Sequence, residues 1–304
     1  MASPSLDCRL AYASELAYSI AHDGSGFSID PSAPHYEEVG FAAGTAPACF
    51  AQGVDLINAG YVAETEDGWV LVVFRGTLPP TDQSFWPWVE DWLQDFEIGP
   101  VPWTVAGRPY GQVEGGFARA VHGLWYDVTR ALGAIDLSRK RGIWVTGHSK
   151  GAALTPLAAS LLRAQFPSVY LRATGFAMPL ACDRSFRDAY DAAGLGAVTV
   201  RYQNEYDLVP FLPWVPTFAL LATAERLDRE PGVNLSVTPE AWPTNDYVEL
   251  GLLEYITTSC QIESGPGAWY AAFRALEQAL YRLEFLTVME AHSLTGRYTT
   301  CVCG

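Results

Sequence analysis

Apolar positions along the chain fall into two patterns, short continuous runs and longer stretches in which apolar residues return every three or four positions. The run from Trp69 to Arg75 is the clearest of the first kind, and it predicts a strand that is buried on both faces. The stretch from Gly116 to Leu132 is the clearest of the second kind. Its residues Phe117, Val121 and Leu124 share one helical face, which predicts an amphipathic helix.

Both patterns recur through most of the chain. Strands are expected at residues 55–57, 61–64, 69–75, 143–146, 170–177 and 197–202, and helices at 6–20, 89–96, 116–132, 150–165, 184–193 and around 269–283. The strand–helix alternation from residue 143 to 202 predicts the α/β class, with a mostly parallel central sheet and helices on both faces. No linker, charge block or internal repeat divides the chain, so residues 1–304 are expected to form a single domain.

Composition indicates how large a core the chain can form and which partners its charge disfavours. Of the residues, 49% are hydrophobic and only 17% are charged, which favours a large core and argues against disorder. The formal net charge is −15, and this argues against nucleic-acid binding, which depends on cationic side chains. The same charge would be repelled by an anionic bilayer, so contact with a lipid surface would have to be apolar.

Targeting and membrane signals are weak in this sequence. Residues 1–20 lack a basic start and an uninterrupted apolar run, so no secretory signal is expected within them; a cytoplasmic location and a mature secreted form both remain open. The most apolar later stretch, residues 211–224, is too short for a transmembrane segment and contains Pro213 and Pro216. We interpret it as buried wall or cleft lining.

The six cysteines are too sparse for a disulfide scaffold. Cys301 and Cys303 form a close pair, but no second pair of cysteines or histidines stands at metal-ligand spacing. Free or structural thiols are therefore expected, and no metal or cofactor. In an exported protein, Cys8 could be linked to the C-terminal pair, since the two termini could pack side by side.

The pentapeptide Gly147–Gly151 has the pattern G-x-S-x-G, with Ser149 at its centre. It follows the apolar run 143–145 and precedes a stretch with helical spacing. A serine hydroxyl needs such a sharp strand-to-helix turn to project as a nucleophile, with the next backbone N–H facing the developing oxyanion. Glycines flank the serine because a Cβ there would collide with the neighbouring strand or helix. The context favours a hydrolase nucleophile over a chance match.

A base and a carboxylate can be proposed by position. Asp207 follows the strand expected at 197–202, so it lies at the carboxyl edge of the sheet, where active residues of such folds gather. Among the five histidines, His292 lies in an expected loop after the last helix, and elimination favours it as the base. The order Ser149, Asp207, His292 is that of α/β-hydrolase triads. Taken singly, Asp207 could be a turn cap and His292 a surface residue.

With these residues in place, the chain resembles the class 3 lipases, the family of fungal-type triacylglycerol lipases. The resemblance covers most of residues 6–300. It rests on five segments in order, namely Leu10–Ser14, Val73–Thr77, Gly147–Gly151, Asn204–Pro213, and His292 with Tyr298 beyond it. The resemblance implies the α/β-hydrolase fold, with Ser149 as nucleophile, His292 as base and then acid, and Asp207 as its orienting partner.

The resemblance also implies roles beyond the triad. The backbone N–H groups of Thr77 and Lys150 would form the oxyanion hole, and the Lys150 side chain is expected to point to solvent. A lid would lie around residues 78–93, where the aromatic side chains could bind acyl chains or instead pack against the core; these are Phe85, Trp86, Trp88 and Trp92. The family commonly has a histidine where this chain has Glu114, and a second glycine where it has Ala152.

An elaborated cleft wall is expected around residues 211–285. Its apolar side chains could line an acyl pocket, or could equally belong to the core; they are Phe211, Leu212, Trp214, Val215, Phe218, Leu220 and Leu221.

The expected activity is carboxylic ester hydrolysis through an acyl-enzyme, on triacylglycerol or other acyl esters. The substrate could be dissolved or held at a lipid–water interface. Two alternatives stay open. One is a lipase-like scaffold for binding or signalling, and the other is an acyltransferase or phospholipase A1 on the same fold.

Overall fold

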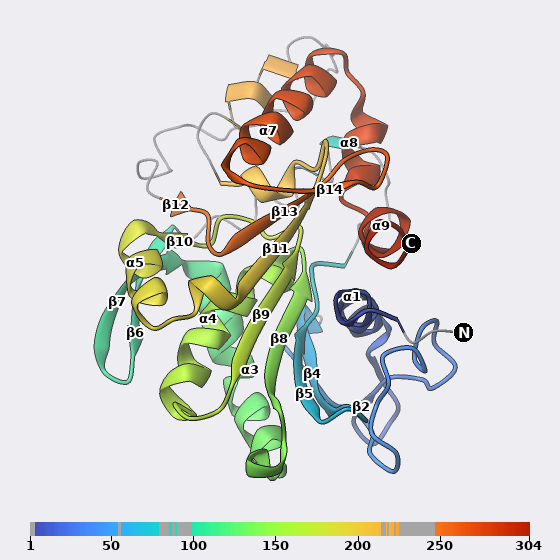
Figure 1. The fold of residues 1–304 in the computed structure, drawn as a ribbon, viewed down its shortest axis with the longest axis vertical. Coiled ribbons are helices and arrows are strands. Elements are labelled where there is room, and N and C mark those ends of the chain that lie inside the picture. The colour runs from blue at the N-terminus through green and yellow to red at the C-terminus, as the bar shows by residue number, and fades with distance from the viewer. Residues whose placement is uncertain are drawn as a thin grey trace.

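A computed structural model gives the fold of residues 4–53, 56–78, 85, 86, 89, 99–213, 217, 219–221, 223, 224 and 247–304. Its centre is an eight-stranded sheet in the order β14-β13-β11-β9-β8-β5-β4-β3 (Figure 1). The strands are β3 (Ala48–Gln52), β4 (Asn58–Glu64), β5 (Trp69–Phe74), β8 (Gly142–His148), β9 (Leu171–Phe176), β11 (Thr199–Asn204), β13 (Leu252–Ile256) and β14 (Ile262–Ser264). Strands β5, β8, β9, β11 and β13 are parallel, whereas β3, β4 and β14 pair antiparallel with their neighbours.

The apolar runs of the sequence become the central strands because both of their faces are covered. Every residue of β5 and of β8 is buried. Along β8, Ile143 and Val145 point into one core cluster while Trp144 points into the other, as the two-residue period of a strand requires.

Helices cover both faces of the sheet (Figure 1). Their bounds are α1 (Leu6–Leu16), α3 (Gly115–Gly133), α4 (Lys150–Gln165), α5 (Arg184–Ala192), α7 (Pro266–Tyr281), α8 (Phe285–Ala291) and α9 (Thr300–Cys303). The core cluster that contains Leu10 of α1 lies on one face, and the cluster that contains Phe117 of α3 and Leu157 of α4 lies on the other. The predicted α/β class and the two-sided covering of the sheet are confirmed.

Several boundaries differ from the sequence expectation. A strand was expected at residues 55–57, but the edge strand is β3, which ends at Gln52. Asp55 lies outside the described residues, and Leu56 has a positive φ of 56°. A tight turn leaves no room for an extended pair there. The first helix ends at Leu16, followed by a short 3₁₀ turn at Ala17–Ser19. The helix expected at 89–96 lies outside the described residues apart from Val89.

A second, smaller sheet escaped the sequence reading. Its order is β12-β10-β7-β6, formed by β6 (Pro100–Val105), β7 (Arg108–Glu114), β10 (Cys182–Asp183) and β12 (Tyr247–Val248). A two-stranded sheet of β1 (Ala21–His22) and β2 (Phe27–Ser28) lies near the N-terminal end. Strands β1, β2, β10 and β12 have only two residues each, and β6 and β7 contain Pro100, Pro102 and Pro109, a residue that argues against a strand in a sequence.

Two disulfides join the two ends of the chain to each other and the C-terminal end to the loop after β13. Cys8 of α1 is bonded to Cys303 of α9, and Cys260 is bonded to Cys301. The link of Cys8 to the C-terminal pair is therefore present, and α1 and α9 lie side by side (Figure 1). Cys49 and Cys182 are free thiols.

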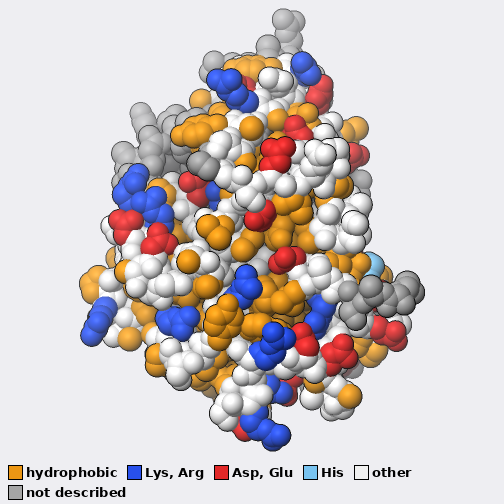
Figure 2. Space-filling model, viewed as in Figure 1, with side chains coloured by type: hydrophobic (Ala, Val, Ile, Leu, Met, Phe, Trp, Pro, Cys, Tyr) orange, Lys and Arg blue, Asp and Glu red, His pale blue; other side chains and the backbone are white. Residues whose placement is uncertain are grey.

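The surface charges and the helix lengths concern possible contact with a membrane. On the face drawn in Figure 2, acidic and basic side chains lie interspersed, with apolar side chains between them. Among the described residues, none of the helices is both long and apolar enough to cross a membrane.

Candidate active site

Ser149 occupies the turn between β8 and α4 in a strained conformation, with φ 63° and ψ −130°. We call this turn, residues Gly147–Gly151, the elbow. The neighbouring chain leaves no room for side chains on either side of it. A Cβ on Gly147 would lie 2.5 Å from the Gly151 carbonyl carbon, and a Cβ on Gly151 would lie 2.2 Å from the Phe74 carbonyl oxygen. The collisions expected from the sequence are thus present, and they explain why the serine is flanked by glycines.

Three side chains that are distant in sequence form one hydrogen-bonded line. Ser149 Oγ lies 2.8 Å from His292 Nε2, and His292 Nδ1 lies 3.1 and 3.2 Å from the two carboxylate oxygens of Asp207. Ser149 and Asp207 are buried, and His292 is 7% exposed. Because a carboxylate can only accept, Nδ1 carries the hydrogen and Nε2 is free to accept the serine proton. The structure brings together the three residues that the sequence singled out.

The Asp207 carboxylate is held in place by two further hydrogen bonds besides those with His292. It lies three residues beyond the end of β11, and its Oδ1 accepts the backbone N–H of Val209 at 3.0 Å. Its Oδ2 accepts the Tyr298 hydroxyl at 2.6 Å, and the Tyr298 oxygen in turn accepts the backbone N–H of Asn204 at 3.0 Å. Burial, and then the negative charge of Asp207, raise the pKa of Tyr298 well above its ordinary value. The tyrosine therefore remains a proton donor to the carboxylate.

His292 follows α8 directly as its C-terminal cap, where the sequence predicted a loop. The last carbonyls of a helix have no partners within it. Here side chains supply them, because Asn204 Nδ2 donates to the Ala291 oxygen at 2.9 Å, and His148 Nε2 lies 2.9 Å from the His292 oxygen. The backbone that carries the imidazole is therefore anchored to β11 and to the elbow.

The loop after β5 lies against the elbow, where the resemblance implied an oxyanion hole. A Cβ on Gly76 would be 2.7 Å from the His148 carbonyl oxygen and 3.0 Å from Ser149 Cβ, so the next residue, half-buried Thr77, is close to the nucleophile. Lys150 is the first residue of α4, whose first N–H groups have no acceptor within the helix and lie at its positive end. Both candidate donors are therefore near the serine.

One expectation about Lys150 is wrong. Its side chain was expected to point to solvent, but it is only 5% exposed. The close packing of α4 against the sheet around the elbow leaves the side chain inside the protein rather than on its surface.

The aromatic residues of the expected lid are described only in part. Phe85 and Trp86 are buried, and both rings contact Phe285 of α8, at centroid distances of 4.3 and 5.3 Å. These contacts agree with packing against the body of the protein, the alternative that the sequence left open. Trp88 and Trp92 lie outside the described residues, as does most of the segment 78–93.

The expected cleft wall is likewise described in part. Phe211, Leu212, Leu220 and Leu221 are buried in the core cluster on the α3–α4 face. The Phe211 ring lies 5.3 Å from Trp269 and 5.2 Å from Phe273, so this part of the wall packs against α7. Trp214, Val215 and Phe218 lie outside the described residues.

The two departures from the family pattern have local structural effects. Glu114 is fully buried at the N-terminal cap of α3, where its Oε2 accepts the Phe117 N–H at 2.9 Å. Ala152 packs close to β9, since a Cβ on Gly175 would lie 3.1 Å from its methyl group. Glu114 therefore caps a helix, and Ala152 packs α4 against the sheet.

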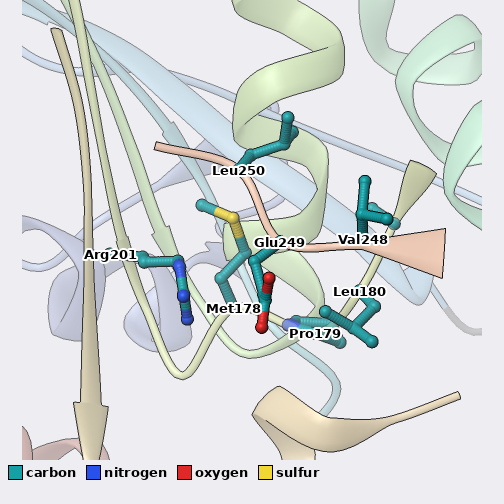
Figure 3. Close-up of a pocket in the computed structure, with 8 residues that line it drawn as sticks. Met178, Pro179, Leu180, Arg201, Val248, Glu249 and Leu250 are labelled. Atoms are coloured by element: carbon teal, nitrogen blue, oxygen red, sulfur yellow. The ribbon is translucent and has the colours of Figure 1, made fainter. Parts of the chain in front are cut away.

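A pocket lined by none of the triad residues lies between β11 and the segment after β12 (Figure 3). Its walls are mostly apolar, and the Arg201 guanidinium points toward it from β11. Arg201 is 7% exposed, and its Nη1 donates to Gln203 Oε1 at 3.3 Å. Burial lowers the pKa of Arg201 to about 10, so it remains charged at neutral pH. Among the described residues, no cluster of three metal-ligating side chains is present.

Comparisons with known proteins agree with this geometry. Residues 71–216 match the family model described as lipase (class 3), so the resemblance expected from the sequence is confirmed. A fungal lipase crystal structure is similar with a TM-score of 0.60 and 21% identity, over 96% of this chain and 95% of that chain. A search of the curated proteins found no match.

Other solved lipases give the same result. A triacylglycerol lipase from Penicillium expansum has a TM-score of 0.55 and 17% identity, over 86% of this chain and 82% of that chain. A triacylglycerol lipase whose catalytic centre is described as a serine protease triad has a TM-score of 0.57 and 18% identity, over 84% and 82%. At such identities the likeness concerns the fold, and it confirms the α/β-hydrolase architecture.

The site includes residues that sequence reasoning missed. Asn204 and Tyr298 were noted only as parts of matching segments, and Tyr18 was not noted at all. Their roles depend on contacts across 94 residues between Asn204 and Tyr298, and across 130 between Tyr18 and His148. A pattern within one segment cannot reveal such contacts.

Proposed function

We propose that this chain is a serine carboxylic ester hydrolase of the lipase type, with Ser149, His292 and Asp207 as its catalytic triad. The observation that carries the proposal is the continuous line of hydrogen bonds from Ser149 Oγ through His292 to Asp207. The match to the class 3 lipase family and the fungal lipase fold support it independently of that geometry.

In the first half of the proposed reaction, Ser149 Oγ attacks the ester carbonyl carbon while His292 Nε2 takes the hydroxyl proton. The tetrahedral oxyanion is stabilised by the backbone N–H groups of Thr77 and Lys150. Collapse of this intermediate breaks the C–O bond of the ester, and His292 gives its proton to the departing alcohol. The acyl group is then bound to the serine oxygen.

In the second half, water attacks the acyl-enzyme and His292 removes its proton. The same two N–H groups stabilise the second oxyanion, and the serine leaves with the proton from His292. Asp207 keeps the hydrogen on Nδ1 and offsets the positive charge of the imidazolium in both halves. The nucleophile, the base and the oxyanion donors in these steps are all groups of the protein.

The substrate class we propose is acyl esters with an apolar acyl chain, triacylglycerol among them. The match to the class 3 lipase family and the likeness to solved triacylglycerol lipases support this substrate class. A rate profile over p-nitrophenyl esters from acetate to palmitate would define the preferred chain length. The notion of an apolar acyl site would be wrong if acetate were preferred over every longer chain.

A serine-directed phosphonate tests the triad itself. It should form one covalent adduct, on Ser149, and block ester hydrolysis, while Ser149→Ala should take up no label and retain the melting temperature of the wild type within a few degrees. A folded wild-type protein that neither reacts with the phosphonate nor cleaves esters would instead be a lipase-like scaffold. Acyl transfer would be seen as ester products when an added alcohol competes with water.

We also propose that the protein works in an oxidising compartment. Disulfides persist in exported proteins and are rare in the reducing cytosol, and four of the six cysteines are paired here. Mass spectrometry of protein isolated from its natural source, after alkylation without reduction, tests this. Alkylation of Cys8 and Cys303 in that sample would place the protein in a reducing compartment.

A further inference from the structure

Two buried side chains outside the triad are hydrogen-bonded in line to the backbone of the base. The Tyr18 hydroxyl lies 2.8 Å from His148 Nδ1, and His148 Nε2 lies 2.9 Å from the His292 carbonyl oxygen. We infer that His148 and Tyr18 are positioning residues, which hold the His292 backbone so that its imidazole stays in line with Ser149. The inference rests on the proposed function, because it concerns the base of that reaction.

The direction of both hydrogen bonds follows from chemistry. A carbonyl oxygen can only accept, so His148 Nε2 must carry a hydrogen. The ring is 5% exposed, and burial together with the nearby His292 lowers the pKa of His148 well below its ordinary value. A neutral ring with hydrogen on Nε2 has a bare Nδ1, so the Tyr18 hydroxyl donates to it. Tyr18 thereby fixes the tautomer that His148 needs in order to bind the His292 carbonyl.

The groups that face His148 favour this neutral state. The His292 ring lies 4.8 Å away and becomes positively charged in the proposed reaction, so a second charge on His148 would repel it. The Tyr298 ring packs at 5.8 Å, nearly edge-on. Burial raises the pKa of Tyr18, so its hydroxyl stays protonated and remains a donor throughout the working pH range.

Tyr18 also reaches the loop that we propose for the oxyanion hole. A Cβ on Gly76 would lie 2.1 Å from the Tyr18 oxygen, so only glycine allows this close approach. The hydroxyl is thus in contact with the backbone next to Thr77 while it donates to His148. One side chain from the segment after α1 therefore connects the oxyanion loop, the elbow and the base.

His148 can be tested by two substitutions that differ only in reach. Glutamine places an amide N–H near the position of Nε2 and can still donate to the His292 carbonyl, whereas asparagine reaches only the position of Nδ1. With a soluble p-nitrophenyl ester, we expect kcat to fall less than about tenfold in His148→Gln and about 10–100-fold in His148→Asn, from the loss of one buried hydrogen bond at a position-sensitive site. KM should change less than about twofold in both variants, since both ring nitrogens of His148 are bonded to groups of the protein.

Tyr18→Phe removes only the hydroxyl. We expect kcat to fall about 3–10-fold, the equivalent of one neutral hydrogen bond. The matched control is Tyr61→Phe, which loses a buried hydroxyl that donates to the Ala13 oxygen at 2.8 Å on the same side of the sheet. That control should keep the kcat of the wild type, because the Tyr61 hydroxyl bonds the backbone of α1 and not a residue of the triad. Equal kcat in the glutamine and asparagine variants, or in Tyr18→Phe and Tyr61→Phe, would overturn the inference.

A spectroscopic measurement separates this inference from the proposed function. In ¹⁵N-histidine-labelled wild-type protein, His148 should show the neutral form with hydrogen on Nε2 and should not titrate between about pH 5 and 8. Titration near the ordinary histidine value, or hydrogen on Nδ1, would refute the positioning role whether or not the protein is active. Failure of the wild type to cleave any ester would refute the function and leave this measurement as the test of the geometry.

Discussion

The Tyr298 hydroxyl donates a 2.6 Å hydrogen bond to Asp207 Oδ2, the carboxylate oxygen that also lies 3.2 Å from His292 Nδ1. The tyrosine therefore holds the carboxylate in position while the carboxylate binds the histidine. Because both residues are fully buried, no water can replace the phenol without rearrangement of the core. The orientation of the proposed base depends on this pair as well as on Asp207 itself.

Replacement of Tyr298 by phenylalanine should affect stability and catalysis together. Loss of a buried hydrogen bond to a charged group should lower the free energy of unfolding by about 1.5–3 kcal/mol. The carboxylate would gain freedom to rotate, and we expect kcat to fall about 10–100-fold because His292 would lose part of its alignment with Ser149. Urea unfolding and ester kinetics measure the two effects. Tyr190→Phe is a suitable control, because its hydroxyl pairs with Thr199 at 2.8 Å in another part of the core.

The Asp207→Asn variant should keep the shape of the site and change the tautomer. The amide can donate to Nδ1, which would place the hydrogen on Nε2 and remove the acceptor that Ser149 needs. We expect kcat to fall by about 10⁴-fold with little change in KM. A fall of less than tenfold in a correctly folded variant would show that Asp207 does not orient the base.

Thr77→Val tests the hydroxyl of the proposed oxyanion loop. Valine keeps the backbone N–H and the branched shape, so only a hydroxyl contribution to the oxyanion is lost. We expect hydrolysis to slow by up to about 10²-fold if that contribution exists. Pre-steady-state measurement of acylation would locate the effect in the chemical step. Unchanged acylation would mean that the backbone N–H groups suffice.

The pH dependence of stability should carry a contribution from His148. Its folded-state pKa is lowered by burial, so below about pH 6.5 the unfolded chain binds a proton that the folded protein does not. The free energy of unfolding should therefore fall as pH falls below this value, by up to about 1.4 kcal/mol per pH unit for this group. His148→Gln should flatten the pH profile between about pH 6.5 and 5. Parallel profiles for the variant and the wild type would contradict a neutral, buried His148.

The Cys8–Cys303 disulfide closes nearly the whole chain into one loop, with a sequence separation of 295. Its removal by Cys303→Ser should lower the free energy of unfolding by about 2–5 kcal/mol, since the unfolded chain loses a long-range constraint. Thermal unfolding under non-reducing conditions measures the change. Cys49→Ser is the control, because Cys49 is a free thiol and its replacement removes no cross-link. Equal melting temperatures for the two variants would argue against this disulfide in solution.

Much of the central fold and the nucleophile Ser149 could be predicted from sequence, because each depends on a local pattern. The elbow has a continuous sequence signal. It consists of the apolar run at Ile143–Val145, the glycines around Ser149 and the helical spacing that follows. Asp207 and His292 followed from their order and from the rule that active residues lie at the carboxyl ends of parallel strands. Long, buried elements with a strong period leave the clearest sequence signal.

The rest was decided by tertiary structure. The strand at Ala48–Gln52 and the sheet of β6, β7, β10 and β12 have mixed exposure, so no simple period marks them. The burial of Lys150 and the contacts of Phe85 depend on neighbours that are distant along the chain. The sequence by itself determined which residues could do chemistry, since the backbone geometry of an elbow is local. Only the folded chain decided how Tyr18, His148 and Tyr298 hold that chemistry in line, since a hydrogen bond depends on distance in space and not on separation in sequence.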